Sequence, residues 1–380
     1  MPRPRFLYVD NLRWTAIILV LSMHAADTYS PLGNWYYVDR RSLPLSSLLF
    51  FAAWQMYLQS FFMGLLFFLA GYFVPASLDR KGPKEFLRDR TFRLGLPVLF
   101  YMFVLGPITE YFCAHSWTST EPTSFPNEWI KHIRNEEFLQ ENGPLWFCLA
   151  LLIFSIFYVS MRLLISRSNT TWEYGRPPTT LQLIGLALAM AGLTFVVRLV
   201  LPSGFSFLNM HLGDFPQYIL LFSGGILASR KRWLQNMNLS SGICWLAIVL
   251  PVGLAAWLTI LLKGGALSGK DEAFSGGWHW QAASMNLWES FSCVAICYGL
   301  LAIYARKFNS QGPLAKFCSD NAFSVYVFHP PILILAARGL HVLDWPAIPK
   351  FILLTTIAAI ASFVLSAAVF RRIPLLRDIL

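Results

Sequence analysis

The sequence predicts an all-α integral membrane protein with about ten transmembrane helices in one bundle. Hydrophobic residues make up 56% of the chain and charged residues only 13%, about half the charged share of soluble domains. Apolar runs of about 20 residues, the length that crosses a bilayer as a helix, recur along the chain. The 30 Lys and Arg residues fall in short segments between these runs. Membrane topology explains that distribution, so we expect a lipid bilayer and no nucleic acid as a partner.

The ten expected spans leave little room for a separate soluble domain, so we expect one domain over residues 1–380. The sixth span is short and contains Gly224-Gly225, which leaves its boundaries open to tilt, a break or shielding by protein. The spans are residues 11–30, 48–74, 94–112, 144–165, 181–201, 215–229, 242–262, 282–304, 319–340 and 350–370.

Loop charge predicts how these spans are oriented. Most Lys and Arg residues fall in alternate loops, on the same side as the N-terminus, and cytoplasmic loops carry such an excess. We therefore expect a multi-pass protein of the cytoplasmic (inner) membrane with both termini in the cytoplasm. The opening Met1–Arg5 segment resembles a secretory signal, but Arg13 directly before the short apolar run and His24 in the cleavage region favour an uncleaved helix.

The first span carries the ionisable side chains of Arg13 and His24, with ten residues between them. Eleven helical steps are about three turns, so both side chains share one helix face, about 16 Å apart along the axis. An ionisable group inside the hydrocarbon layer costs on the order of 3 kcal/mol, which indicates function. The alternative is a packing histidine that hydrogen-bonds a neighbour, for which Asp27 is placed one turn further on.

The inner loop after the second span is rich in arginine. Arg90 and Arg93 are three residues apart, so they would point the same way on a helix, and Arg88 is close by. Guanidinium groups suit phosphates because each offers a planar fork of donors. Contact with lipid headgroups explains the same charges equally well.

Two further motifs lie where helices begin or bend. Gly143-Pro144 precedes Trp146 at the start of the fourth span, where Trp146 fits either an interfacial aromatic belt or a pocket. In the ninth span, Tyr326 and His329 precede two prolines. His329 supplies a second intramembrane imidazole, and the prolines predict a kink that frees backbone carbonyls. Short metal-ligand spacings, HExxH and GxSxG are absent, so we expect neither a metal site nor a serine-hydrolase mechanism.

Taken together, these motifs resemble the membrane acyltransferase 3 family over nearly the whole chain. The Asp10–Arg13 opening and the Phe328–Pro331 element are similar to the branch that includes glucan biosynthesis protein C. One departure is Ala70-Gly71-Tyr72, where relatives often have Ser-Gly-Tyr. The motifs that carry the resemblance are Arg13 and His24 separated by ten residues, Phe61-Phe62-Met63-Gly64 to Gly71-Tyr72-Phe73, Arg90-x-x-Arg93 before Leu94-Gly95-Leu96-Pro97, Gly143-Pro144-Leu145-Trp146 and Ser324-x-Tyr326-x-x-His329-Pro330.

The resemblance implies transfer of an acyl group, acetyl or succinyl, from cytoplasmic acyl-CoA to a hydroxyl of an extracytoplasmic glucan or other glycan. Acetyl-CoA or succinyl-CoA would then be a donor substrate, and we expect no permanently bound cofactor. His24 would act as general base, which we favour, or as a nucleophile that carries the acyl group.

The other candidate residues would support that chemistry. Arg90 and Arg93, with Arg88, would hold the phosphates of the donor, and Arg13 would assist donor binding or steady the helix. His329, Tyr326 and Trp146 are supporting or acceptor-side candidates; for His329 a hydrogen bond, a proton path and plain packing all stay open. Arg198 is a conceivable partner for a dicarboxylic acyl group.

Two alternatives remain at this point. A proton-coupled transporter of a glycan or small molecule would use His24 and His329 as a relay and explains intramembrane ionisable groups and kinked helices without acyl chemistry. A transferase with a cytoplasmic or lipid-linked acceptor would keep the same catalytic groups and change only the acceptor.

Overall fold

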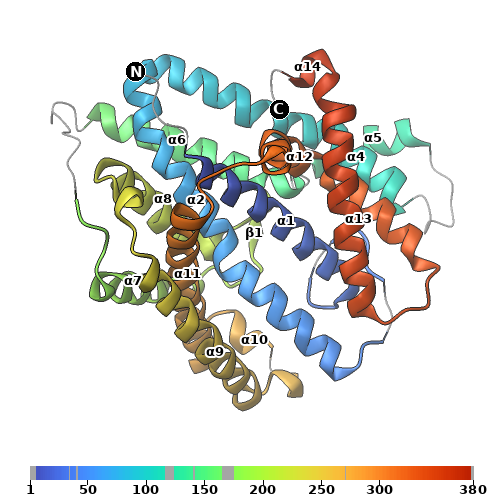
Figure 1. Cartoon of the computed structure of the whole chain (residues 1–380). Coiled ribbons are helices and arrows are strands. Elements are labelled where there is room, and N and C mark those ends of the chain that lie inside the picture. The colour runs from blue at the N-terminus through green and yellow to red at the C-terminus, as the bar shows by residue number, and fades with distance from the viewer. Residues whose placement is uncertain are drawn as a thin grey trace. The chain divides into compact units, whose positions relative to one another are not determined.

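The computed structural model of the chain describes residues 6–33, 35–39, 42–115, 124–139, 142–164, 175–269 and 271–377. Figure 1 shows an almost wholly helical fold, which confirms the expectation of an all-α membrane protein. Within the described residues, seven helical stretches are long and apolar enough to cross a membrane. They are Leu45–Cys113, Gly143–Leu164, Thr180–Arg198, Leu239–Gly264, Trp280–Lys307, Pro313–His341 and Ala347–Arg372.

The count is lower than ten for two reasons. The second and third expected spans belong to one helical stretch, and α1 (Leu7–Tyr29) and α8 (Phe215–Arg230) are outside the seven. Polar residues such as Arg13 and His24 interrupt the apolar character of α1. The 16 residues of α8 extend only about 24 Å, short of a hydrocarbon core of about 30 Å.

The inner segment expected between residues 74 and 94 is helical apart from a break at Gly82. Helix α2 runs over Leu45–Arg90 and leaves helical geometry at Gly82 (φ 75°), directly before Pro83. The loop was inferred from polarity alone, but its Ala, Leu, Lys, Arg and Glu residues are strong helix formers. Beyond α2, π-helical turns alternate with short helices: Thr91–Gly95, α3 (Leu96–Phe100), Tyr101–Leu105, α4 (Gly106–Ile108) and Thr109–His115.

The chain forms two compact units, and each is described by itself. Within the described residues, the first unit comprises 6–12, 59–86 and 155–311, and the second comprises 13–58, 87–154 and 312–377. Helices α1 and α2 and helix α6 (Trp146–Leu164) contribute to both.

In the first unit, α11 (Trp280–Lys307) packs along α9 (Leu239–Gly264) and along α7 (Thr180–Arg198), as Figure 1 shows. Short α10 (Glu272–Ser275) precedes α11. A two-stranded hairpin, β1 (Ser206–Phe207) and β2 (Met210–His211), departs from the all-helical expectation. Its turn residues Leu208 and Asn209 have φ near +50°, which a tight two-residue hairpin requires.

Close helix packing in the first unit gives Gly71 of the Ala70-Gly71-Tyr72 motif a structural reason. A Cβ added at Gly71 would lie 2.1 Å from the carbonyl oxygen of Phe222 on α8. Small residues allow such backbone approach in membrane bundles, so the glycine is required there whatever residue precedes it.

In the second unit, α12 (Pro313–His341) and α13 (Ala347–Ala368) are packed together, followed by α14 (Pro374–Arg377). Helix α5 (Phe125–Arg134) and the turn Gly143–Leu145 complete the unit before α6. Gly143 has φ 50°, and an added Cβ would lie 2.5 Å from the ring of Tyr101. The Gly143-Pro144 motif therefore serves close packing as well as a helix start.

Candidate active site

Three parallel aromatic rings form the centre of the candidate site in the second unit. The imidazole of His24 on α1 stacks on the indole of Trp35, with centroids 3.8 Å apart and 13° between the planes. The imidazole of His329 on α12 lies 5.4 Å from that of His24, at 14°. The structure thus brings together the two histidines that the sequence analysis singled out, from opposite ends of the chain.

His24 is oriented by a carboxylate. Its Nδ1 lies 3.1 Å from Oδ2 of Asp27, one turn further along α1. The other carboxylate oxygen of Asp27 accepts a hydrogen bond of 2.6 Å from Nε2 of Gln55 on α2. A carboxylate can only accept, so Nδ1 of His24 carries a proton, and in the neutral imidazole Nε2 holds the lone pair.

The ring of His24 is still reachable, although Asp27 and Gln55 are buried. The side chain of His24 keeps 21% of its surface exposed. A histidine that only packs against its neighbours would also hydrogen-bond Asp27. Such a histidine would not need an exposed side chain, so the exposure of His24 favours a functional role. A partly exposed imidazole held by a buried carboxylate is the arrangement that general bases use.

His329 is fully buried and held by the backbone of its own helix. Its Nδ1 lies 2.8 Å from the carbonyl oxygen of Tyr326. Within the part of the chain that the structure describes, Nε2 of His329 is buried and has no hydrogen-bond partner.

Tyr326 connects two elements of the second unit. Its hydroxyl donates a hydrogen bond to the carbonyl oxygen of Pro144, and its ring lies 6.2 Å from that of His329. Tyr326 therefore fixes α12 against the start of α6. Trp146 is half-buried two residues after Pro144.

Trp35 belongs to a strap, which we define as residues 35–39, that follows α1 on the chain. The buried carboxylate of Asp39 lies 2.8 Å from the buried ammonium of Lys350 on α13 and 3.4 Å from His341 on α12. Tyr36 shares a hydrogen bond of 3.1 Å with the buried Tyr101. These contacts hold the strap so that Trp35 covers one face of His24.

The arginines at the start of the third expected span are partly brought together. The guanidinium of Arg90 interacts electrostatically with Asp89 and with the guanidinium groups of Arg13 and Arg93. Arg93 is exposed and lies 3.2 Å from Asp89, whereas Arg90 is half-buried. Arg88 is exposed two positions before Arg90, and positions two apart face different sides of a helix.

Arg198 lies in the first unit and already has acidic partners. Its guanidinium contacts Asp214 at 2.6 Å and Glu289 at 2.9 Å, and it is buried. The Nη1 atom of Arg198, which contacts Glu289, also donates a hydrogen bond to Oδ1 of Asn286. These two carboxylates already occupy the single positive charge of Arg198, so Arg198 does not present a spare cation for a dicarboxylic acyl group.

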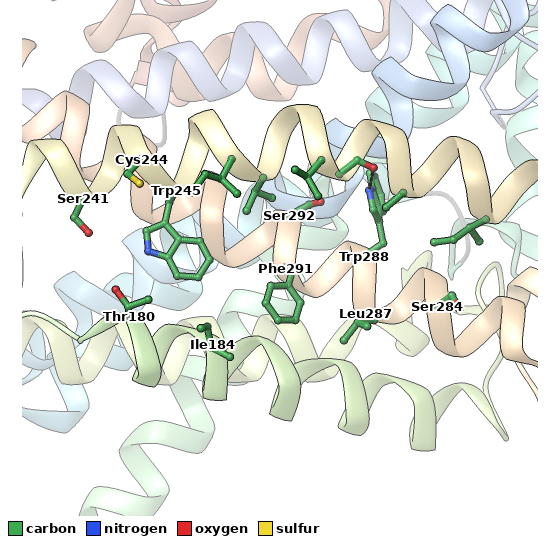
Figure 2. A pocket seen from close by; sticks show the side chains of 16 residues that line it. Thr180, Ile184, Ser241, Cys244, Trp245, Ser284, Leu287, Trp288, Phe291 and Ser292 are labelled. Atoms are coloured by element: carbon green, nitrogen blue, oxygen red, sulfur yellow. Dashed lines mark hydrogen bonds between the residues drawn. The ribbon is translucent and has the colours of Figure 1, made fainter.

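An apolar cavity of about 700 Å³ lies in the first unit between α7 and α9, with α11 as its floor (Figure 2). Its lining includes Trp245, Trp288 and Phe291, and no histidine, acidic or basic residue. The cavity therefore lacks the groups that acid–base chemistry needs. Among the described residues, no group of three or more His, Cys, Asp and Glu side chains could hold a metal ion.

Sequence reasoning missed Trp35 and Gln55. Gln55 is one of two amides, with Gln59, in the apolar run 48–74, and Trp35 begins a Trp-Tyr-Tyr cluster shortly after the first span. Both are polar or aromatic exceptions within their surroundings, which is the signal that could have identified them.

A family model described as an acyltransferase domain matches residues 6–371. This range is nearly the whole chain and includes every residue of the site. No curated protein and no solved structure has significant similarity to the chain.

Proposed function

The chain belongs to the acyltransferase 3 family and is a membrane acyltransferase, and from this premise we propose that it transfers an acetyl or succinyl group from cytoplasmic acyl-CoA to a hydroxyl of an extracytoplasmic glucan or other glycan. The observation that carries the proposal is the Asp27–His24 pair, because a partly exposed imidazole oriented by a buried carboxylate suits proton abstraction from a hydroxyl.

In the proposed reaction, Nε2 of His24 removes the proton of the acceptor hydroxyl as its oxygen attacks the thioester carbonyl carbon. The carbon–sulfur bond then breaks, and the coenzyme thiolate takes the proton back from His24. Asp27 stabilises the imidazolium that exists between these two proton transfers. Direct transfer requires no acyl-histidine intermediate, which remains the alternative role for His24.

The donor would bind through its phosphates to Arg90 and Arg93, with Arg13 adjacent. The like-charge interaction of Arg90 with Arg13 and Arg93 supports this assignment, because a multiply charged anion would relieve the repulsion among these guanidinium groups. In the topology that we propose, ten spans with both termini in the cytoplasm, this cluster faces the cytoplasmic donor. A succinyl group and a glucan acceptor follow from the branch that includes glucan biosynthesis protein C.

The test is acyl transfer by purified protein in liposomes. Radiolabelled acetyl-CoA or succinyl-CoA is supplied on the side of the Arg90 cluster, and glucan oligosaccharides are enclosed on the other side. We expect labelled glycan from the parent, none from His24→Ala, and parent-like transfer from His279→Ala, which removes an exposed histidine of the first unit.

Failure of the parent to consume either thioester with any glycan would contradict the proposal. A proton-coupled transporter without acyl chemistry would then become the leading function. Transfer only to an acceptor on the donor side would retain the enzyme and change the side of its acceptor.

A further inference from the structure

The histidine–proline sequence of α12 determines which nitrogen of His329 carries the proton. In a regular helix, the carbonyl of Tyr326 accepts a hydrogen bond from the N–H of residue 330. Pro330 has no N–H, and Nδ1 of His329 lies 2.8 Å from this carbonyl oxygen instead. Because a carbonyl only accepts, Nδ1 is the protonated nitrogen and Nε2 has the lone pair.

That lone pair is buried without a partner. His329 is 0% exposed, and its Nε2 has no hydrogen-bond partner within the residues that the structure describes. Buried polar atoms in native proteins are nearly always paired, so an unpaired acceptor needs an explanation.

The ring that carries this acceptor lies beside the proposed base. The ring of His329 is 5.4 Å from that of His24 and nearly parallel to it, and the indole of Trp35 lies 6.3 Å from His329 at 9°. A substrate whose reacting atoms contact His24 therefore brings its neighbouring atoms close to His329.

We propose that Nε2 of His329 accepts a hydrogen bond from a donor group of the substrate next to the reacting atom. The inference rests on the proposed function and assigns a subsite to it. Two groups have this chemistry: the amide N–H of the pantetheine arm, two methylenes from the thioester sulfur, and the hydroxyl that adjoins the reacting hydroxyl of the sugar.

A proton relay through His329 does not fit this geometry. A relay takes a proton on one ring nitrogen and releases another from the second, but Nδ1 of His329 faces the carbonyl of Tyr326. A backbone carbonyl cannot pass a proton on. His329 thus positions a substrate, and His24 moves the proton.

Two substitutions separate the subsite from a structural role. His329→Asn retains an N–H donor near the position of Nδ1 and removes the acceptor at Nε2. His329→Gln has a longer amide whose oxygen reaches the position of Nε2. If His329 only supports the kinked helix, Asn is the better replacement; if Nε2 binds substrate, Gln is the better one.

The measurement is kcat/KM for acyl transfer in liposomes, together with the thermal transition of each variant. We expect His329→Asn to lower kcat/KM about tenfold, as for the loss of one hydrogen bond, and His329→Gln to recover most of that loss, with similar thermal transitions. The inference would be overturned if His329→Asn were as active as the parent, or if His329→Asn were more active than His329→Gln.

Substrate analogues then distinguish the two donor groups. An acetyl thioester whose adjacent pantetheine amide is N-methylated lacks the N–H, and deoxy-glucose oligosaccharides lack single hydroxyls. The analogue that lacks the donor group bound by His329 should be transferred more slowly than the normal substrate by the parent. His329→Asn should transfer this analogue and the normal substrate at similar rates. If neither analogue shows this coupling, the inference is wrong although transfer continues; if the parent transfers nothing, the proposed function fails as well.

Discussion

The indole of Trp35 lies face to face with the imidazole of His24, 3.8 Å between centroids. The strap that carries Trp35 has anchors on α12 and α13, so this cover is held from outside α1. It closes one face of the imidazole, while 21% of the His24 side chain stays exposed, as a site that admits a substrate and limits water requires.

Removal of the cover should admit water to the reaction. We predict that Trp35→Leu raises the ratio of thioester hydrolysis to glycan transfer about tenfold, because an aromatic stack contributes about 0.5–1.5 kcal/mol and the smaller side chain leaves His24 exposed. The ratio follows from free coenzyme A and labelled glycan measured in one assay. Trp278→Leu is the control, since Trp278 is 83% exposed in the first unit; an unchanged ratio in Trp35→Leu would contradict a shielding role.

The carboxylate of Asp27 should matter through charge and orientation. Asp27→Asn retains the side-chain shape but presents either an N–H or a neutral oxygen to Nδ1 of His24. We predict a loss of kcat of about 10²-fold or more, within the range for general acid–base catalysis, at nearly unchanged KM for acyl-CoA. Initial rates over a range of acyl-CoA concentrations measure kcat and KM separately.

Gln55→Leu tests the second partner of Asp27 and should cost less. The carboxylate retains its contact with His24 and loses one hydrogen bond from Gln55, a contact worth about 1.5–3 kcal/mol for a charged group. We predict a loss of kcat of roughly 10–100-fold. A larger loss than in Asp27→Asn would show that Gln55 contacts the substrate itself.

Gly33 gives Asp27 its space. A Cβ added at Gly33 would lie 2.1 Å from Oδ1 of Asp27, a separation that real contacts do not allow, so the carboxylate must move. We predict that Gly33→Ala lowers kcat at least tenfold with little change in thermal stability. Gly339→Ala adds the same methyl group on α12, where nothing lies within 4 Å, and should leave transfer unchanged.

Donor binding should depend on Arg90 more than on Arg88. Arg90 has two guanidinium neighbours, so a phosphate bound there would contact a concentrated positive charge. We predict that Arg90→Gln raises KM for acyl-CoA about tenfold and weakens its salt dependence, whereas Arg88→Gln changes KM less than threefold. Equal changes of KM in Arg90→Gln and Arg88→Gln would indicate that the basic residues act only as a general positive charge that attracts lipid headgroups or the donor.

The sequence predicted the helical membrane class because composition and apolar runs report it directly. The polarity of the segment after Gly82 did not indicate a helix, although its helix-forming residues did, and the break itself is a single positive φ at Gly82. The relation of His24 to Asp27 was predictable from helical periodicity.

The rest of the site depends on tertiary contacts. Trp35 reaches His24 only because Asp39 pairs with Lys350, 311 positions away, and no local pattern contains that pairing. Arg198 shows the opposite error: its type suggested a ligand, but two carboxylates distant in sequence neutralise it.

The Asp39–Lys350 pair itself supports the last prediction. Both side chains are nearly fully buried, and removal of one partner of a buried pair leaves an uncompensated charge that costs about 3–5 kcal/mol. We predict that Lys350→Met lowers the thermal transition markedly and also raises the hydrolysis ratio, because the strap loses its anchor. Asp39→Ala combined with Lys350→Met should restore much of the thermal stability, since no charge is then left unpaired, but not the ratio. Lys316→Met breaks an exposed pair with Asp320 and should change neither quantity, because such pairs contribute about 0–1 kcal/mol. If the double variant regained parent-like hydrolysis, the anchor would be irrelevant to the position of Trp35 over His24.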